Sequence, residues 1–96
     1  MSKDTKPQPQ SLESVIITPE TVVSGYRIKK RFQLLMVRKT VLYAEMAFEE
    51  LESGLRKATK DVGGNAVIGV RISHESLKTS TDVYLTGLAV ELVPSR

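Results

Sequence analysis

The sequence predicts an α+β fold in which one helix packs on a small antiparallel sheet, a two-layer sandwich in the order β-α-β-β. Three observations lead to this prediction. Apolar residues in 41–62 recur at three- and four-residue steps, which is typical of one helix face. Residues 66–73 and 82–93 are short, largely apolar stretches of strand length. Residues 26–37 begin with an alternation of charged and apolar side chains, which indicates a third strand.

Length and composition bound the class of protein. The 96 residues fit one small domain. Residues 1–12 are rich in Lys, Pro, Gln and Ser and predict a disordered tail, which leaves 13–96 as a single α+β domain. The chain has no cysteine, so disulfides and thiolate metal sites are excluded. No apolar run is long enough to span a bilayer and no signal-peptide core is present, so we expect a cytoplasmic protein without a membrane partner.

The predicted helix has signals at both ends. Thr40 is the expected N-cap, because its hydroxyl can accept a hydrogen bond from a free backbone N–H. Glutamates gather in the first half and Lys or Arg in the second, as the helix dipole favours. Gly63 predicts the end, since glycine readily adopts the left-handed conformation that terminates helices. Phosphate-binding loops precede a helix N-terminus, so the loop at 63–65, which follows a C-terminus, is interpreted as structural.

The strands predict more apolar surface than one helix can cover. In 66–73, the residues Ala66, Ile68, Val70 and Ile72 share one parity and are expected to pack under the helix. One helix covers only one face of a sheet, and the apolar residues of opposite parity then lie on an uncovered face. Glycines on that face would let a second backbone approach closely. The predicted interface comprises Leu35, Val37, Val67, Gly69, Leu85 and Gly87.

This uncovered face predicts a homo-oligomer. A closed ring is the expected form, because closed symmetry satisfies the interface of every copy. A short strand around 15–17, stopped by Pro19, is expected to protect a sheet edge by pairing with a neighbouring copy. A Val67→Glu substitution is expected to break the assembly and to lower stability, because it would bury a charge at the interface.

Four segments resemble the YbjQ family: 24–28 (Ser-Gly-Tyr-Arg-Ile), 47–51 (Ala-Phe-Glu-Glu-Leu), 64–70 (Gly-Asn-Ala-Val-Ile-Gly-Val) and 87–90 (Gly-Leu-Ala-Val). The resemblance covers most of 16–93, and 64–70 is its strongest part. It implies a dodecin subunit-like fold, pentameric rings completed by short extra strands, and the heavy-metal binding ascribed to the family. The chain departs from the family in lacking a glycine-rich insertion before the helix, since residues 35–40 run almost directly into it.

A metal site is a weak candidate. His74 with Glu75 and Asp82 offers metal ligands, but one histidine per chain completes a coordination shell only across subunits. A solvated hairpin histidine is the favoured interpretation of His74. The sequence identifies no cofactor.

A nucleic-acid interface is the second alternative. Arg27, Lys29 and Arg31 are expected to project from one strand face beside Tyr26 and Phe32. Basic residues can bind phosphates and aromatic rings can stack on bases. A solvated or edge-protecting charged strand is the favoured interpretation of this basic run.

No pair of nucleophile and base at suitable spacing indicates catalysis. The favoured function is therefore a non-enzymatic, ring-forming homo-oligomer, structural or ligand-holding, with a pentamer of itself as the expected partner. Nucleic-acid binding and metal binding are the alternatives.

Overall fold

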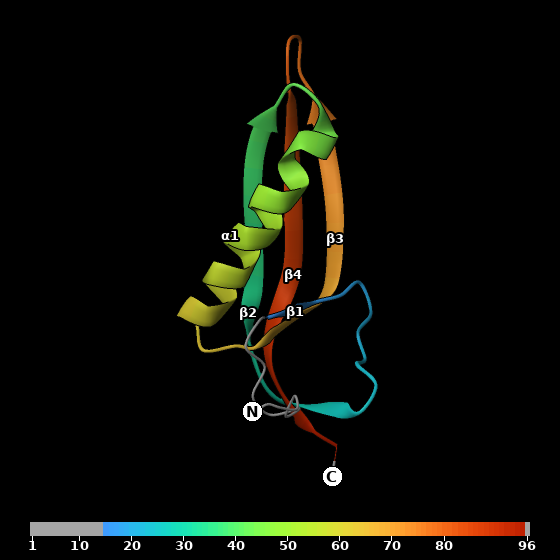
Figure 1. Ribbon diagram of the computed structural model, residues 1–96, viewed down its shortest axis with the longest axis vertical. Helices are drawn as coiled ribbons and strands as arrows, with labels where there is room; N and C mark the ends of the chain where they lie inside the picture. The colour runs from blue at the N-terminus through green and yellow to red at the C-terminus, as the bar shows by residue number, and fades with distance from the viewer. Residues whose placement is uncertain (1–14, 96) are drawn as a thin grey trace, which may run out of the picture.

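A single helix lies diagonally across one face of a four-stranded sheet in the computed structural model, which describes residues 15–95 (Figure 1). The elements follow in the order β1 (Ile16–Ile17), β2 (Tyr26–Val41), the 3-10 turn η1 (Ala44–Ala47), α1 (Phe48–Asp61), β3 (Ala66–Ser76) and β4 (Thr81–Pro94). The strand order is β1-β3-β4-β2. The α+β class and the single helix are confirmed, and the predicted tail at 1–12 lies outside the described residues.

The sheet is mixed, whereas the sequence predicted an antiparallel one. β4 pairs antiparallel with both β2 and β3, but β1 pairs parallel with β3. Backbone hydrogen bonds join Ile16 N to Asn65 O at 3.2 Å and Thr18 N to Val67 O at 3.1 Å. The short first strand was expected to pair with a neighbouring copy. It instead covers the beginning of β3 in the same chain.

The helix begins later than predicted. β2 continues to Val41, which lies opposite Thr81, and the chain then forms η1 before α1 starts at Phe48. The predicted N-cap is wrong, because the Thr40 hydroxyl donates to Asp82 Oδ1 on β4 instead. Neither η1 nor α1 has a side-chain cap. Pairing with β4 therefore prevails over the capping signal at this position.

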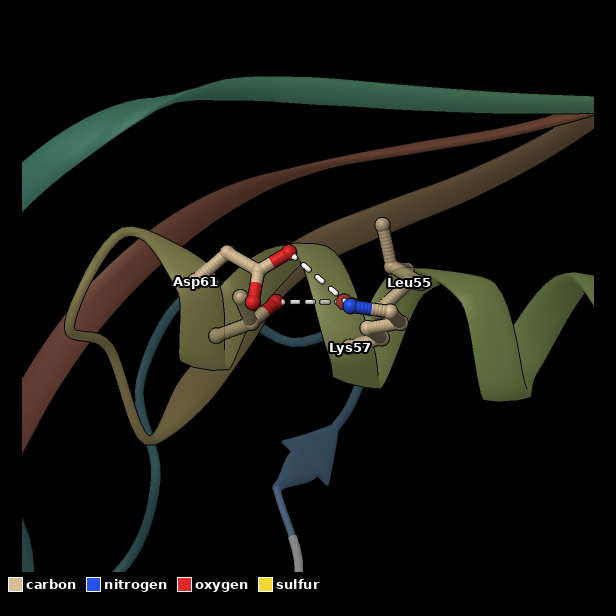
Figure 2. Close-up of polar contacts among 4 residues, drawn as sticks. Leu55, Lys57 and Asp61 are labelled. Carbon is tan, nitrogen blue, oxygen red and sulfur yellow. Dashed lines mark hydrogen bonds and ion pairs between the residues drawn. The ribbon is translucent and has the colours of Figure 1, made fainter.

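The helix ends where the sequence predicts. Gly63 has φ +95°, and its N–H donates to Lys60 O at 3.0 Å while Gly64 N–H donates to Thr59 O at 2.9 Å. These two bonds form a Schellman motif, which satisfies the last carbonyls of a helix. In the last turn, Lys57 pairs with Asp61 and the buried Thr59 hydroxyl donates to Leu55 O at 2.7 Å (Figure 2).

Three bulges decide which side chains face the helix. β3 gains one residue between Ile68 and Arg71, where Gly69 has φ +61°. β2 gains one residue between Ile28 and Lys30 and another between Arg31 and Leu34. Each extra residue reverses the parity of the positions after it. We call the sheet face that carries α1 the helix face and the opposite one the outer face.

The facing predicted for β3 is therefore wrong in part. Val67 and Val70 pack in the core cluster with Leu51 and Leu55 of α1. Ala66 and Ile68 pack in a second cluster on the outer face, with Val90 and Leu92. Ala66, Ile68, Val70 and Ile72 do not share a face, because the Gly69 bulge separates the first two from the last two.

The predicted interface residues lie mainly in the core of the chain itself. Leu35, Val67 and Leu85 are buried and Val37 is half-buried, all packed with the α1 cluster. A Cβ at Gly87 would lie 2.4 Å from Val67 Cγ1, so this glycine accommodates the chain's own core. Gly69 is the bulge residue, and its N–H donates to Glu20 O at 2.9 Å. These residues therefore do not lie on an uncovered face, contrary to the sequence prediction. Their part in an oligomer interface stays a prediction.

Candidate functional site

Apolar side chains are exposed on the outer face at the upper half of β2. Leu34 is 73% exposed and Met36 is 65% exposed. They lie opposite Leu88 and Thr86 of β4, which are half-buried. No helix covers this side of the sheet in the described part of the chain (Figure 1). We call Leu34, Met36, Thr86 and Leu88 the outer strip. An uncovered apolar face is therefore present, as predicted, but other residues form it than those that the sequence indicated.

Two sheet edges are open among residues 15–95. β2 is an edge strand along its whole length, because β4 is its only neighbour. β3 is covered only at its beginning, where β1 and the segment after it bond to residues 66–70. Residues 71–76 of β3 are exposed and pair only with β4. Open edges present unpaired backbone groups that another strand can bind.

Two grooves flank α1 on the helix face. The first has a volume of about 380 Å³ and lies toward β3, lined by side chains that include Phe48, Leu51, Val70 and Ile72. The second has a volume of about 460 Å³ and lies toward β2. Its lining includes Val37 and the ion pair between Lys39 and Glu50. A diagonal helix leaves these two margins of the sheet uncovered, one beside each open edge.

A further apolar group lies on the connection between β2 and α1, at the top of Figure 1. Leu42, Tyr43 and Met46 are all exposed, and Phe48 at the start of α1 is partly so. Sequence reasoning assigned this stretch to a helix and therefore missed its exposure.

The sequence predicted that the basic run projects from one strand face, but the structure places its residues on both faces. Arg27 lies opposite Val93 and Arg31 opposite Val90, and these two β4 positions point to opposite faces. Lys29 sits at the bulge between Ile28 and Lys30. All three basic residues are exposed.

Arg27 and Arg31 nevertheless line one cavity of about 240 Å³ at the lower end of β2, together with Tyr26, Ile28 and Leu92.

The aromatic neighbours of the basic run have other partners. The Lys30 ammonium lies 5.1 Å from the centre of the Phe32 ring, in a cation–π contact. Phe32 packs against the core cluster below α1. A planar base would therefore find Tyr26 rather than Phe32 beside this cavity.

The structure places the predicted metal ligands of the chain on two different faces of the sheet. His74 lies opposite Val83 and points to the helix face, whereas Glu75 lies opposite Asp82 and points to the outer face. No group of three or more His, Asp or Glu side chains suited to a metal ion occurs within residues 15–95. Metal binding between subunits stays a prediction.

Asn65 is a structural residue that the sequence did not reveal. Its amide nitrogen donates to Leu92 O at 3.0 Å, and its Oδ1 accepts from Leu92 N–H at 2.8 Å. The side chain thereby continues the ladder between β3 and β4 by one rung before β3 begins. The Gly-Asn pair after the helix is thus explained by strand pairing rather than by a ligand.

Comparison with known proteins supports the fold and leaves the function open. No family model matches the chain, and no curated protein matches it. A crystal structure of a DUF74 family protein of unknown function from Pediococcus pentosaceus is similar, with a TM-score of 0.53 and 18% identity. The match covers 84% of this chain and 98% of that one. DUF74 is the YbjQ-like family, and at this level of identity the likeness is one of fold alone.

None of the helices within 15–95 is long and apolar enough to cross a membrane.

Proposed function

We propose that this chain is a non-enzymatic subunit of a cytoplasmic homo-oligomeric ring, with a structural or ligand-holding role. The observation that supports it most is the outer strip, where Leu34 and Met36 are exposed beside an open edge of β2. Exposed apolar patches on small domains mark association surfaces. A closed ring is the form that leaves no copy with an unused edge.

The resemblance to the YbjQ family supports the same proposal from a separate direction. It implies dodecin subunit-like topology and five subunits per ring. The two grooves flanking α1 would then lie at the margins where neighbouring copies meet, and they offer space for a small ligand.

The test compares the native protein with a Leu34→Glu/Met36→Glu double variant. Both substitutions place charge on exposed positions, so the fold should remain intact by circular dichroism. Native mass spectrometry should give a multi-subunit mass for the native protein and mainly single chains for the variant, because charge would face the association surface. Lys57→Glu, on the exposed side of α1, is the matched control and should keep the native mass. A native protein that is a single chain at micromolar concentration would refute the proposal.

Nucleic-acid binding is the second candidate, and the cavity shared by Arg27 and Arg31 favours it. Phosphate contacts through two arginines would make affinity for a single-stranded oligonucleotide fall steeply with salt. An Arg27→Ala/Arg31→Ala variant should lose most of that binding and most of its salt dependence. Absence of binding to the native protein at low salt would remove this candidate.

A further inference from the structure

We propose that residues 36–41 of β2 in one copy pair in parallel with residues 71–76 of β3 in the next copy, so that the sheet continues across the subunit boundary. This inference rests on the proposed self-association and names its partner, a second copy, and its contact. It requires the two segments to have the same length, the same position along β4, the same strand direction and the same face toward the helix.

The two segments have the same length and the same position along β4, because β4 pairs with both of them. Thr86 lies opposite Met36 on one side and Arg71 on the other. At the other end, Thr81 lies opposite both Val41 and Ser76. The two free segments therefore span the same six rungs of the sheet, on its two opposite edges. Below these rungs, β1 blocks the β3 edge and two bulges distort β2.

Direction and face also match. β2 and β3 both run antiparallel to β4, so they run parallel to each other. Copies related by rotation around a ring present the β2 edge of one to the β3 edge of the next, in parallel and with both helices on the same side. The groove beside β3, lined by Phe48 and Ile72, then adjoins the groove beside β2 that Val37 lines.

Charge favours this head-to-tail contact over a two-fold contact between β2 strands. β2 carries six Lys or Arg residues and no acid, so two β2 edges would repel each other. The β3 segment carries one acid, Glu75, and one base, Arg71. Arg38 and Glu75 both point to the outer face, because they lie opposite Tyr84 and Asp82. In an unstaggered parallel pair the two diagonal neighbours of Arg38 are Glu75 and Arg71, whose charges offset each other. A slip of two residues places Arg38 directly opposite Glu75 and away from Arg71, so charge favours the slipped pair.

Within one subunit the same two residues are kept apart by β4. Two strand spacings of about 4.8 Å separate their backbones, so the distance is roughly 10 Å or more. Contact between Arg38 and Glu75 therefore reports on the boundary between copies and not on the fold of one copy.

The experiment uses the absence of native cysteine. Arg38→Cys is mixed with Ser73→Cys, which lies directly opposite it in the unstaggered pair, and separately with Glu75→Cys, which lies opposite it after a slip of two residues. Within one copy, Ser73 like Glu75 is separated from Arg38 by β4. Each mixture is allowed to exchange subunits and is mildly oxidised. Disulfides form only when Cα atoms approach within about 7 Å. A cross-linked dimer should form in one of these two mixtures, which identifies the register, and in none of the variants alone. Mixing Lys57→Cys with Glu75→Cys is the control and should give none, because Lys57 is on the exposed side of α1.

Charge exchange provides a second readout. Arg38→Glu and Glu75→Arg should each weaken assembly, by about twofold to fivefold in dissociation constant per contact. The double variant should recover most of the loss. Both positions are on exposed strand surface, so circular dichroism should stay native.

The possible outcomes distinguish a wrong contact between copies from the absence of an oligomer. An oligomeric protein without the mixed cross-link and without charge recovery overturns the contact and leaves the proposed function standing. A cross-link of Arg38→Cys with itself overturns it in favour of paired β2 edges. A native protein that is monomeric overturns both.

Discussion

The glycines show how strongly single residues depend on their neighbours in this fold. Gly87 lies on the helix face of β4, where a Cβ would come within 2.4 Å of Val67 Cγ1 and 3.0 Å of Val70 Cγ2. Gly54 on α1 has its nearest contact at 3.7 Å, from Val37 Cγ1. The first position has no room for a methyl group, and the second has ordinary room.

Gly87→Ala should therefore lower the free energy of unfolding by about 1–3 kcal/mol, the usual cost of overpacking a core. Val67 is fully buried and cannot move aside freely. Urea unfolding monitored by circular dichroism measures the change. Gly54→Ala is the matched control and should raise stability by up to about 1 kcal/mol, since alanine favours the helix more than glycine does. Equal effects of the two substitutions would contradict the packing described here.

Single residues also show what the sequence can predict. Gly63 was recognised as the helix terminator because its signal is local, and the structure confirms it. Thr40 carried an equally local signal for a cap, but its hydroxyl bonds to Asp82, 42 residues away in sequence. A contact so distant in sequence has no signature in the residues next to Thr40.

At the scale of elements, helix and strands were predictable and their facing was not. The apolar periodicities predicted α1, β2, β3 and β4, although β2, β3 and β4 extend beyond the predicted limits. Parity assigns faces correctly only where the strand is regular. Of the three bulges, only the one in β3 contains a glycine, and the two in β2 fall among Lys, Arg, Phe and Gln. Those two leave no mark in the sequence, so every face assignment beyond them was uncertain.

Gly69→Ala tests the bulge in β3. The position has φ +61°, where a side chain costs about 1–2 kcal/mol, so the variant should unfold at lower urea concentration by that amount. Space is not the reason, since the nearest atom to a Cβ there is Thr21 Cγ2 at 3.7 Å. Gly69→Asn should recover part of the loss, because asparagine tolerates the left-handed region better than alanine. If alanine proves neutral, the bulge is not held in this conformation.

At the scale of the whole molecule, one helix leaves the other face of the sheet uncovered, as the sequence predicted. The apolar residues that remain exposed are not the predicted ones. Val67 was expected at an interface, yet it is fully buried beneath α1. Leu34 and Met36, which the sequence placed in the first long strand, are the residues that remain exposed.

Val67→Glu should consequently abolish folding and not merely assembly, because an unpaired carboxylate in the core costs more than a small domain's stability allows. Circular dichroism and proton NMR should show an unfolded chain. Met36→Glu, on the outer strip, should keep a dispersed spectrum. If the Val67→Glu variant were instead a folded single chain, the helix face and the outer face would be assigned the wrong way round.

The short strand β1 has a consequence for solubility. A protein with two long, complementary sheet borders can add copies without limit and grow into fibres. In the contact proposed between copies, β1 occupies the start of β3 and leaves residues 71–76 as the part of this edge that another strand can pair with. A variant that lacks β1 would expose a longer edge, and we expect it to form filaments more readily.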